Sequence, residues 1–235
     1  MNTNLSYQQT GVMTRVNTFI RSTYNWMAIG LASTGVTSYF VSESPGIMKA
    51  VYGNPIMPWV LFIGLIVMCG FLSARIQKMQ ASTATGLYVG LTVLYGICLA
   101  PIFMIYTQTS IASTFFICAA TFGAASVYGM ITKKDLTGMG QFLMMGLIGI
   151  IIAMVVNLFI QSSAMQTIIS MIAVLLFTGL TAYDTQKLKS MAVTLPMDAT
   201  GAMVRKGAIL GALSLYLDFM GLFVHLLSLL GVSRD

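Results

Sequence analysis

The chain has 235 residues, of which 57% are apolar and only 8% are charged, and its formal net charge is +6. A soluble domain carries roughly 25% charged residues, so this composition excludes an ordinary soluble domain and indicates an integral membrane protein. The length suits one helical bundle. The basic residues lie between apolar segments, where they orient a membrane protein rather than bind nucleic acid.

Seven apolar segments follow a polar N-terminal stretch of residues 1–22, which has no signal-peptide pattern and is expected to be cytoplasmic. Each segment approaches the ~20 residues that a helix needs to cross a bilayer. The sequence therefore predicts an all-α integral membrane protein, with a seven-helix transmembrane domain over residues 23–232 and a short external tail at residues 233–235. The expected spans are residues 23–41, 59–74, 84–106, 111–130, 139–160, 165–183 and 207–232.

The connections between the spans contain residues that break or bend helices. Residues 42–58 are rich in proline and glycine, and one surface turn of helix is expected over residues 47–52. Pro101 lies inside the third span, where its missing N–H predicts a kink. Residues 107–110 are expected to form a minimal turn, and residues 187–206 a basic loop before the last span.

Lys and Arg are distributed unevenly over these connections. If the N-terminus is cytoplasmic, ten of the twelve basic residues lie in cytoplasmic segments, as the positive-inside rule requires. We therefore expect a cytoplasmic N-terminus and an external C-terminus, and the short loops favour a bacterial inner membrane. The ten are Arg15, Arg21, Arg75, Lys78, Lys133, Lys134, Lys187, Lys189, Arg205 and Lys206, and the two external ones are Lys49 and Arg234.

The last span carries its small and polar residues at steps of three and four, which places them on one face of a helix. Almost all its other residues are large and apolar. Small residues allow helices to approach closely, and polar residues avoid lipid, so we expect this face to pack against protein. Its members are Gly207, Gly211, Ser214, Asp218, Gly221, His225 and Ser228.

Two of the six acidic residues are exceptional because they belong to spans. Asp218 lies deep in the last span, about 24 Å inward of Arg234 along a helix, and Asp184 ends the sixth span at a similar expected depth. Two carboxylates in such a place share a proton, bind a metal ion, or pair with a base. Arg75, at the end of the second span, is the candidate base, and His225 could extend an ion or proton path.

Each of these residues also has a plainer explanation. Asp218 and His225 could each make a hydrogen bond between helices, and Asp184 could end a helix beside Lys187. Arg75 could anchor its span at the membrane interface. The three cysteines lie apart inside apolar spans and are interpreted as small packing residues.

Two long motifs resemble the Bax inhibitor-1 family, also called the transmembrane Bax inhibitor motif family, and its bacterial branch in particular. Residues 179–186 (GLTAYDTQ) are similar to the family signature, and residues 210–219 (LGALSLYLDF) are similar to its last helix. Residues 128–136 (YGMITKKDL) fit its loop between the fourth and fifth spans. The resemblance covers the chain from the first span onward.

The resemblance implies a fold and an activity. The fold is a bundle of seven helices in which the last is enclosed by the other six. The activity is a pH-sensitive calcium leak, with no cofactor required, in which Asp184 and Asp218 form the sensor near the cytoplasmic side. An Arg of the second span, for which Arg75 is the candidate, is expected to bond one of these acids when the path is closed.

Other function classes remain open from the residues. A non-transporting regulator that binds other membrane proteins is one, although no partner is identifiable, and a proton-coupled transporter is another. An intramembrane aspartyl protease would use a Tyr–Asp pair such as Tyr183–Asp184, but it also requires Gly-x-Gly before its second acid, and residues 215–217 (LYL) precede Asp218. No catalytic motif appears and His225 is the only histidine, so we expect neither an enzyme nor a zinc site.

Overall fold

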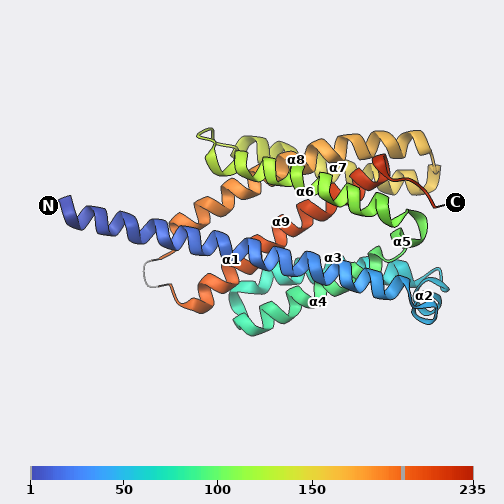
Figure 1. Ribbon diagram of the computed structural model, residues 1–235, viewed down its shortest axis with the longest axis horizontal. Helices are drawn as coiled ribbons and strands as arrows, with labels where there is room; N and C mark the ends of the chain where they lie inside the picture. The colour runs from blue at the N-terminus through green and yellow to red at the C-terminus, as the bar shows by residue number, and fades with distance from the viewer. Residues whose placement is uncertain (1, 197–198, 235) are drawn as a thin grey trace. The chain divides into compact units, whose positions relative to one another are not determined.

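The computed structural model describes residues 2–196 and 199–234, with side chains described from residue 14 onward. In this part of the chain every named element is a helix, and Figure 1 labels them in chain order. The helices are α1 (Asn2–Ser42), α2 (Pro45–Tyr52), α3 (Met57–Arg75), the 3-10 turn η1 (Ile76–Lys78), α4 (Ala81–Leu99), α5 (Ile102–Ile105), α6 (Gln108–Ile131), α7 (Thr137–Ile160), α8 (Ser163–Thr194) and α9 (Gly201–Leu230).

Six helical stretches among the described residues are long and apolar enough to cross a membrane. They correspond to six of the seven spans expected from the sequence. The first expected span, residues 23–41, lies within α1, which is not among the six, because Ser, Thr and Gly are interspersed among its apolar residues. The six are Met57–Lys78, Ala81–Ile105, Gln108–Ile131, Thr137–Ile160, Ser163–Thr194 and Gly201–Leu230.

The expected basic loop over residues 187–206 is wrong, because α8 and α9 are separated only by residues 195–200. Asp184 therefore lies inside α8 rather than at the end of a span. The charged residues that follow it do not interrupt the inner face of the helix. Leu188 and Ala192 continue that face at steps of four from Asp184, and both are buried.

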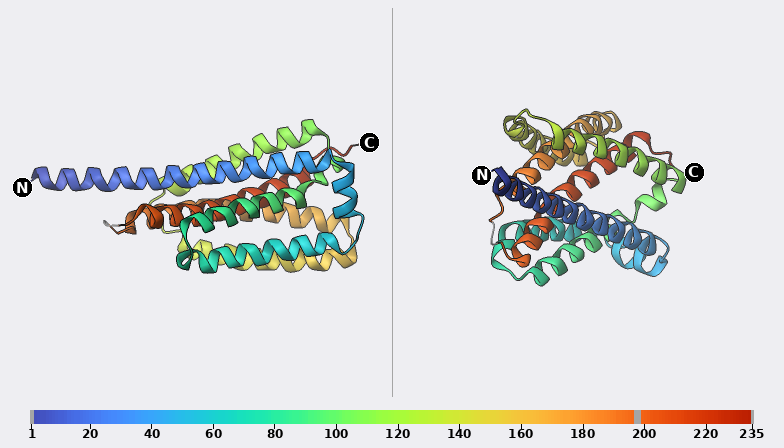
Figure 2. Two further views of the ribbon diagram at one scale, coloured as in Figure 1. Left: turned by 90° about the horizontal axis from the view of Figure 1, so that it is seen from below. Right: turned by 60° about the vertical axis from the view of Figure 1, so that its left-hand side comes forward.

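Other expectations at the N-terminal side fare better. The kink at Pro101 is confirmed as a break, since α4 ends before it and α5 begins after it. The surface turn expected over residues 47–52 is part of α2, which lies across the end of α1 rather than extending it (Figure 2). From Asn2 onward, the polar stretch expected over residues 1–22 lies within α1, which continues unbroken to Ser42 (Figure 1).

The chain divides into two compact units. Unit 1 comprises Met1–Ile105 and Met191–Leu213, and unit 2 comprises Tyr106–Ser190 and Ser214–Asp235. The boundary cuts both α8 and α9, so each unit contains one part of each of these helices.

In unit 1, α1 packs closely against α4. The Thr34 hydroxyl donates to the carbonyl of Thr92 at 2.9 Å, and the hydroxyl of the fully buried Tyr88 donates to the carbonyl of Trp26 at 3.0 Å. Gly30 lies beneath this Tyr88 hydroxyl, where a Cβ atom would collide with it. Polar side chains of α1 and α4 thus donate to backbone carbonyls of the partner helix, at a contact too close for a side chain at Gly30.

The first part of α9 also belongs to unit 1. A Cβ atom on Gly207 would lie 3.0 Å from the ring of Phe19, and the Arg205 guanidinium lies 5.4 Å from the ring of Trp26. The Lys206 ammonium donates to the carbonyl of Gln77 at 2.8 Å. These contacts fasten the start of α9 to α1 and to the turn after α3.

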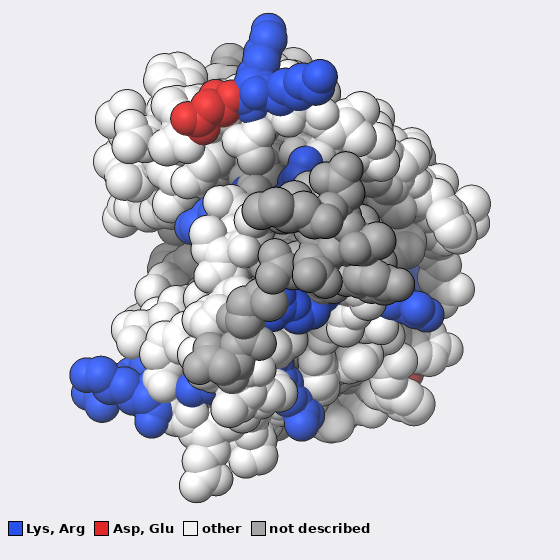
Figure 3. Space-filling model, turned by 90° about the vertical axis from the view of Figure 1, so that its left-hand side faces the viewer, with Lys and Arg blue, Asp and Glu red and all other residues white. Residues whose placement is uncertain are grey.

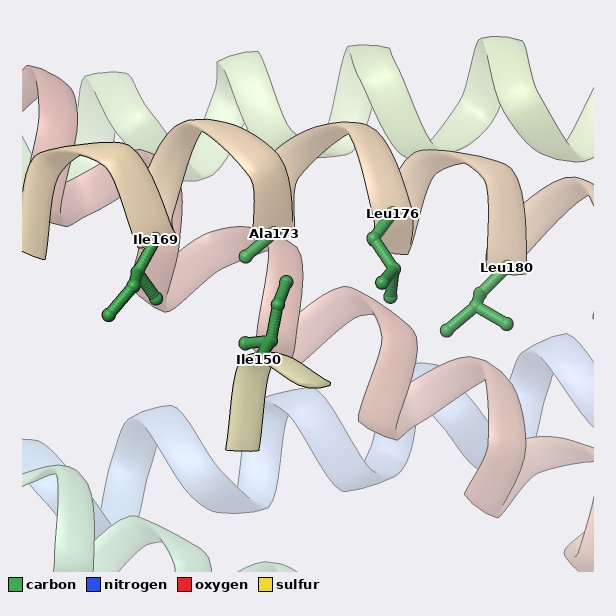
Figure 4. Close-up of a cluster of buried hydrophobic side chains, with 5 residues drawn as sticks. All are labelled: Ile150, Ile169, Ala173, Leu176 and Leu180. Atoms are coloured by element: carbon green, nitrogen blue, oxygen red, sulfur yellow. The ribbon is translucent and has the colours of Figure 1, made fainter. Parts of the chain in front are cut away.

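In unit 2, α7 and α8 share an apolar cluster. Four side chains at steps of three and four along α8 face one side chain of α7 (Figure 4). Burial of a large aliphatic side chain contributes about 1.5–3 kcal/mol, so this cluster accounts for much of the attachment of α7. The five residues are Ile150, Ile169, Ala173, Leu176 and Leu180.

The burial of α9 separates it from the other candidate spans. In its most apolar stretch 61% of the residues are buried, against 6% to 33% in the other five. The polar face expected to pack on protein is buried at Gly207, Gly211, Asp218 and His225, whereas Ser228 is exposed. Burial also extends beyond that face, since α9 carries fully buried apolar residues on its remaining sides.

We expect Gly30→Ala to destabilise the protein, because the added methyl group would force Tyr88 away from the Trp26 carbonyl. Overpacking of this kind typically costs about 1–3 kcal/mol. The matched control is Gly35→Ala on the same helix, where nothing lies within 4 Å of an added Cβ. Thermal unfolding in detergent measures both variants, and equal midpoints would contradict the close α1–α4 contact.

Candidate functional site

The second part of α9 runs antiparallel to α8 within unit 2. The Nδ1 atom of His225 lies 3.2 Å from the Ser170 hydroxyl, and Gly221 lies against the ring of Phe177, where a Cβ atom would collide with it. As the residue number rises on α8, it therefore falls on α9. Asp184 on α8 and Asp218 on α9 lie further along this pair of helices, on the side of Phe177 and Gly221 away from His225.

The two acids lie close enough for their charges to interact. Helical side chains tilt toward the N-terminus of their own helix, so on antiparallel helices Asp184 and Asp218 tilt toward each other. Asp218 is 5% exposed, and its buried Oδ2 atom has no hydrogen-bond partner among the described residues. Asp184 is less enclosed and also interacts with the charge of Lys187. A buried polar atom without a partner costs free energy unless a proton or a cation occupies the site.

Glycines bring α8 against its neighbours at the level of Asp184. A Cβ atom on Gly129 of α6 would collide with the backbone carbonyl of Ala182, and one on Gly140 of α7 would collide with the ring of Tyr183. Since Ala182 and Tyr183 directly precede Asp184, the backbone at this acid is fixed from two sides.

Side chains that follow Asp184 fasten the same part of α8. The Thr185 hydroxyl donates to the Ser126 hydroxyl at 3.4 Å in a fully buried contact. The Gln186 amide donates to the carbonyl of Lys134 at 2.8 Å and accepts from the backbone N–H of Leu136 at 2.9 Å. The neighbours of Asp184 within residues 179–186 thus hold it in place through their contacts with α6 and with the connection between α6 and α7.

That connection is itself capped. The Oδ1 atom of Asp135 accepts from the backbone N–H of Thr137 at 2.9 Å and from its hydroxyl at 2.6 Å. These hydrogen bonds lower the pKa of Asp135 below its ordinary value, since they favour the charged form. A carboxylate at this position also complements the positive end of the α7 dipole.

Arg75 is the last residue of α3 and is exposed. It belongs to unit 1, whereas both acids belong to unit 2. Its pairing with either acid therefore stays a prediction.

His225 belongs to a chain of polar side chains that the sequence analysis did not single out. Ser170 contacts His225 at 3.2 Å, accepts from the Gln166 amide at 3.4 Å and donates to the Ser228 hydroxyl at 3.3 Å. The Asn157 amide donates to Gln166 at 3.3 Å. Polar residues inside otherwise apolar spans were the available signal, since Asn157, Gln166 and Ser170 all lie within the expected fifth and sixth spans.

Curated relatives of the chain are bacterial. It is 42% identical over 219 residues to the inner membrane protein YbhL of Escherichia coli K12, with 93% of each chain covered. It is 38% identical over 231 residues to a protein of Deinococcus radiodurans, covering 98% of this chain and 97% of that one. A membrane protein of Streptococcus pyogenes serotype M1 is 32% identical over 235 residues, with 98% of this chain and 99% of the relative covered.

The family model described as "Inhibitor of apoptosis-promoting Bax1" matches residues 16–235. The chain belongs to the Bax inhibitor family. The match includes both aspartates, the α8 segment around Asp184 and the polar chain at His225. As a Bax inhibitor family protein with six membrane-length helices among its described residues, it is a membrane protein whose apolar surface contacts lipid.

We expect Gln186→Leu to loosen the connection between α6 and α7. The change removes two hydrogen bonds, each worth about 0.5–1.5 kcal/mol net, so the Leu136 amide should exchange with solvent roughly tenfold faster or more. Val193→Ala, an exposed change further along α8, is the control and should leave this exchange unchanged. Hydrogen–deuterium exchange of the detergent-solubilised protein measures the exchange rate of the Leu136 amide. Equal protection of this amide in both variants would show that Gln186 does not hold the connection.

Proposed function

We propose that this member of the Bax inhibitor family is a calcium leak channel of a bacterial inner membrane, controlled by proton binding to Asp184 and Asp218. The observation that carries the proposal is the buried Asp218 carboxylate, whose Oδ2 atom has no hydrogen-bond partner in the described part of the chain. A second acid lies within reach of its charge. Ionisable residues inside membrane spans are costly and typically mark ion or proton pathways.

The proposed fold has seven spans, with α1 as the first and α9 enclosed by the others. Two features of α1 support its role as a span. Its polar side chains Thr34 and Ser38 are buried, whereas Ile29, Val36 and Phe40 are exposed at steps of seven and four and form an apolar outer face. The high burial of α9 supports its enclosed position.

The proposed orientation places the N-terminus in the cytoplasm. Figure 3 looks from the side of the α1 N-terminus, and nearly all the charged surface in this view is basic. Basic residues accumulate on the cytoplasmic side of membrane proteins. The similarity to YbhL, an inner membrane protein, supports the inner membrane as the location.

The proposed control rests on repulsion between the two acids. At acidic pH they share a proton, which removes the repulsion and holds α8 and α9 together. At higher pH the shared proton leaves, and the pair then holds a cation or separates. Arg75 is the proposed base that bonds one acid in the closed state.

Calcium fits the chemistry of the pair because it prefers carboxylate oxygen ligands. The described residues contain no group of three or more His, Cys, Asp or Glu that could hold a metal ion. The proposed calcium contact is therefore transient, with backbone carbonyls and water supplying the remaining ligands. Such a weak site suits an ion that has to leave again.

A non-transporting regulator of other membrane proteins is the second candidate, and the description of the family as an inhibitor of a Bax protein favours it. The protease reading finds no support. Leu215 and Tyr216, which precede Asp218, are 1% and 0% exposed, so a substrate backbone would find no space there. We propose that the protein is not an enzyme.

We expect Asp218→Asn to abolish the pH response of calcium flux into liposomes that contain the purified protein. The wild type should conduct more calcium at about pH 8 than at about pH 6, because the acid pair loses its shared proton as the pH rises. The amide cannot exchange that proton, so flux through the variant should be equal at both values. Glu43→Gln, in the connection between α1 and α2, is the charge-matched control. An unchanged pH response in Asp218→Asn would remove Asp218 from the control of flux.

A further inference from the structure

The polar chain at His225 lies on one side of an apolar level between α8 and α9, and the acid pair lies on the other. On α9, Gly221 is one turn from Asp218 and one turn from His225, on the same face. On α8, Phe177 is two turns from Ser170 and two turns from Asp184 on a shared face. The helix pair therefore carries polar, apolar and acidic levels in that order.

The apolar level is filled by the Phe177 ring. Three atoms of this ring lie so close to Gly221 that a Cβ atom there would collide with all of them. The ring also stacks on His225, with centroids 6.1 Å apart and planes inclined by 23°. Phe177 thus occupies the space that the missing side chain of Gly221 leaves open.

The opposite side of α9 is also apolar at this level. Phe219 packs against Phe115 and Phe122 of α6, with ring centroids 5.4 and 5.5 Å apart. Phe223 contacts Phe115 at 6.2 Å. These aromatic rings fill the α6 side of α9 at this level.

We propose that Phe177, seated on Gly221, is the apolar gate of the conduction path, and that His225, Ser170, Gln166 and Asn157 form the polar vestibule beyond it. This inference rests on the proposed function, since a gate requires a path. An apolar constriction stops ions by excluding water, and movement of the ring away from Gly221 would admit it. The acid pair sets when the path opens, and Phe177 is the part that blocks it.

Calcium flux tests the gate. Phe177→Ala should conduct at acidic pH, where the wild type is closed, by roughly tenfold or more above the wild type, because water fills the vacated level. Phe177→Leu keeps an apolar side chain of smaller size and should give an intermediate flux. Leu176→Ala is the matched control, because it truncates a neighbouring buried side chain that packs toward α7. Equal flux increases in Phe177→Ala and Leu176→Ala would reduce the effect to lost packing and overturn the proposal.

Thiol labelling tests the gate without ion flux. Thr181→Cys places a reporter between Phe177 and the acid pair, in a background where Cys69, Cys98 and Cys118 are replaced by serine. At the acidic pH at which the wild type is closed, a small membrane-impermeant thiol reagent, added on the side of the α9 C-terminus, should label this reporter only when Phe177→Ala is also present. The exposed position Ser228→Cys should be labelled with or without that change.

The labelling and flux measurements together distinguish failure of the proposed gate from failure of the proposed channel. Labelling that depends on Phe177→Ala, together with no calcium flux in any variant, would keep the barrier and reject the channel. At this acidic pH, labelling of Thr181→Cys with Phe177 intact, or no labelling when Phe177→Ala is present, would reject the gate whatever the flux.

Discussion

A carboxylate inside a membrane-spanning helix costs at least about 2.5–3.5 kcal/mol, so the residues around Asp218 have to offset this cost or remove the charge. The described part of the chain gives one of its two oxygens no hydrogen-bond donor, and it brings a second acid near rather than a base. Neighbours of this kind favour the neutral form or a bound cation. This arrangement therefore supports the proposed exchange of a proton or a cation at Asp218, which a purely structural hydrogen bond would not require.

The rest of unit 2 keeps one half of this pair fixed. The segment around Asp184 is fastened by a contact of Gly129 with its backbone, by a contact of Gly140 with the Tyr183 ring, and by hydrogen bonds of the two residues after Asp184. Contacts between backbones adjust little, because closely packed interiors resist small displacements. Side chains such as the Phe177 ring can therefore move more easily than the backbone of α8.

The sequence predicts most of the fold because long apolar segments in membranes have few alternatives to helices. Pro101 and residues 47–52 were read correctly, since proline and helical periodicity act locally. The charges after Asp184 predict too early an end for α8, because the buried face of the helix continues through Leu188. The contact between Phe177 and Gly221 was not predictable, because it depends on the register of two helices, which the pattern within each helix does not determine.

That register also explains why the two acids and the aromatic ring have separable roles. Asp184 and Asp218 carry charge but leave the apolar level untouched, and Phe177 fills that level without carrying charge. Ion passage through a low-dielectric layer requires both a place for the charge and a continuous wet route. Because the two requirements fall on different residues of one helix pair, separate substitutions can test the proposed proton sensor and the proposed barrier.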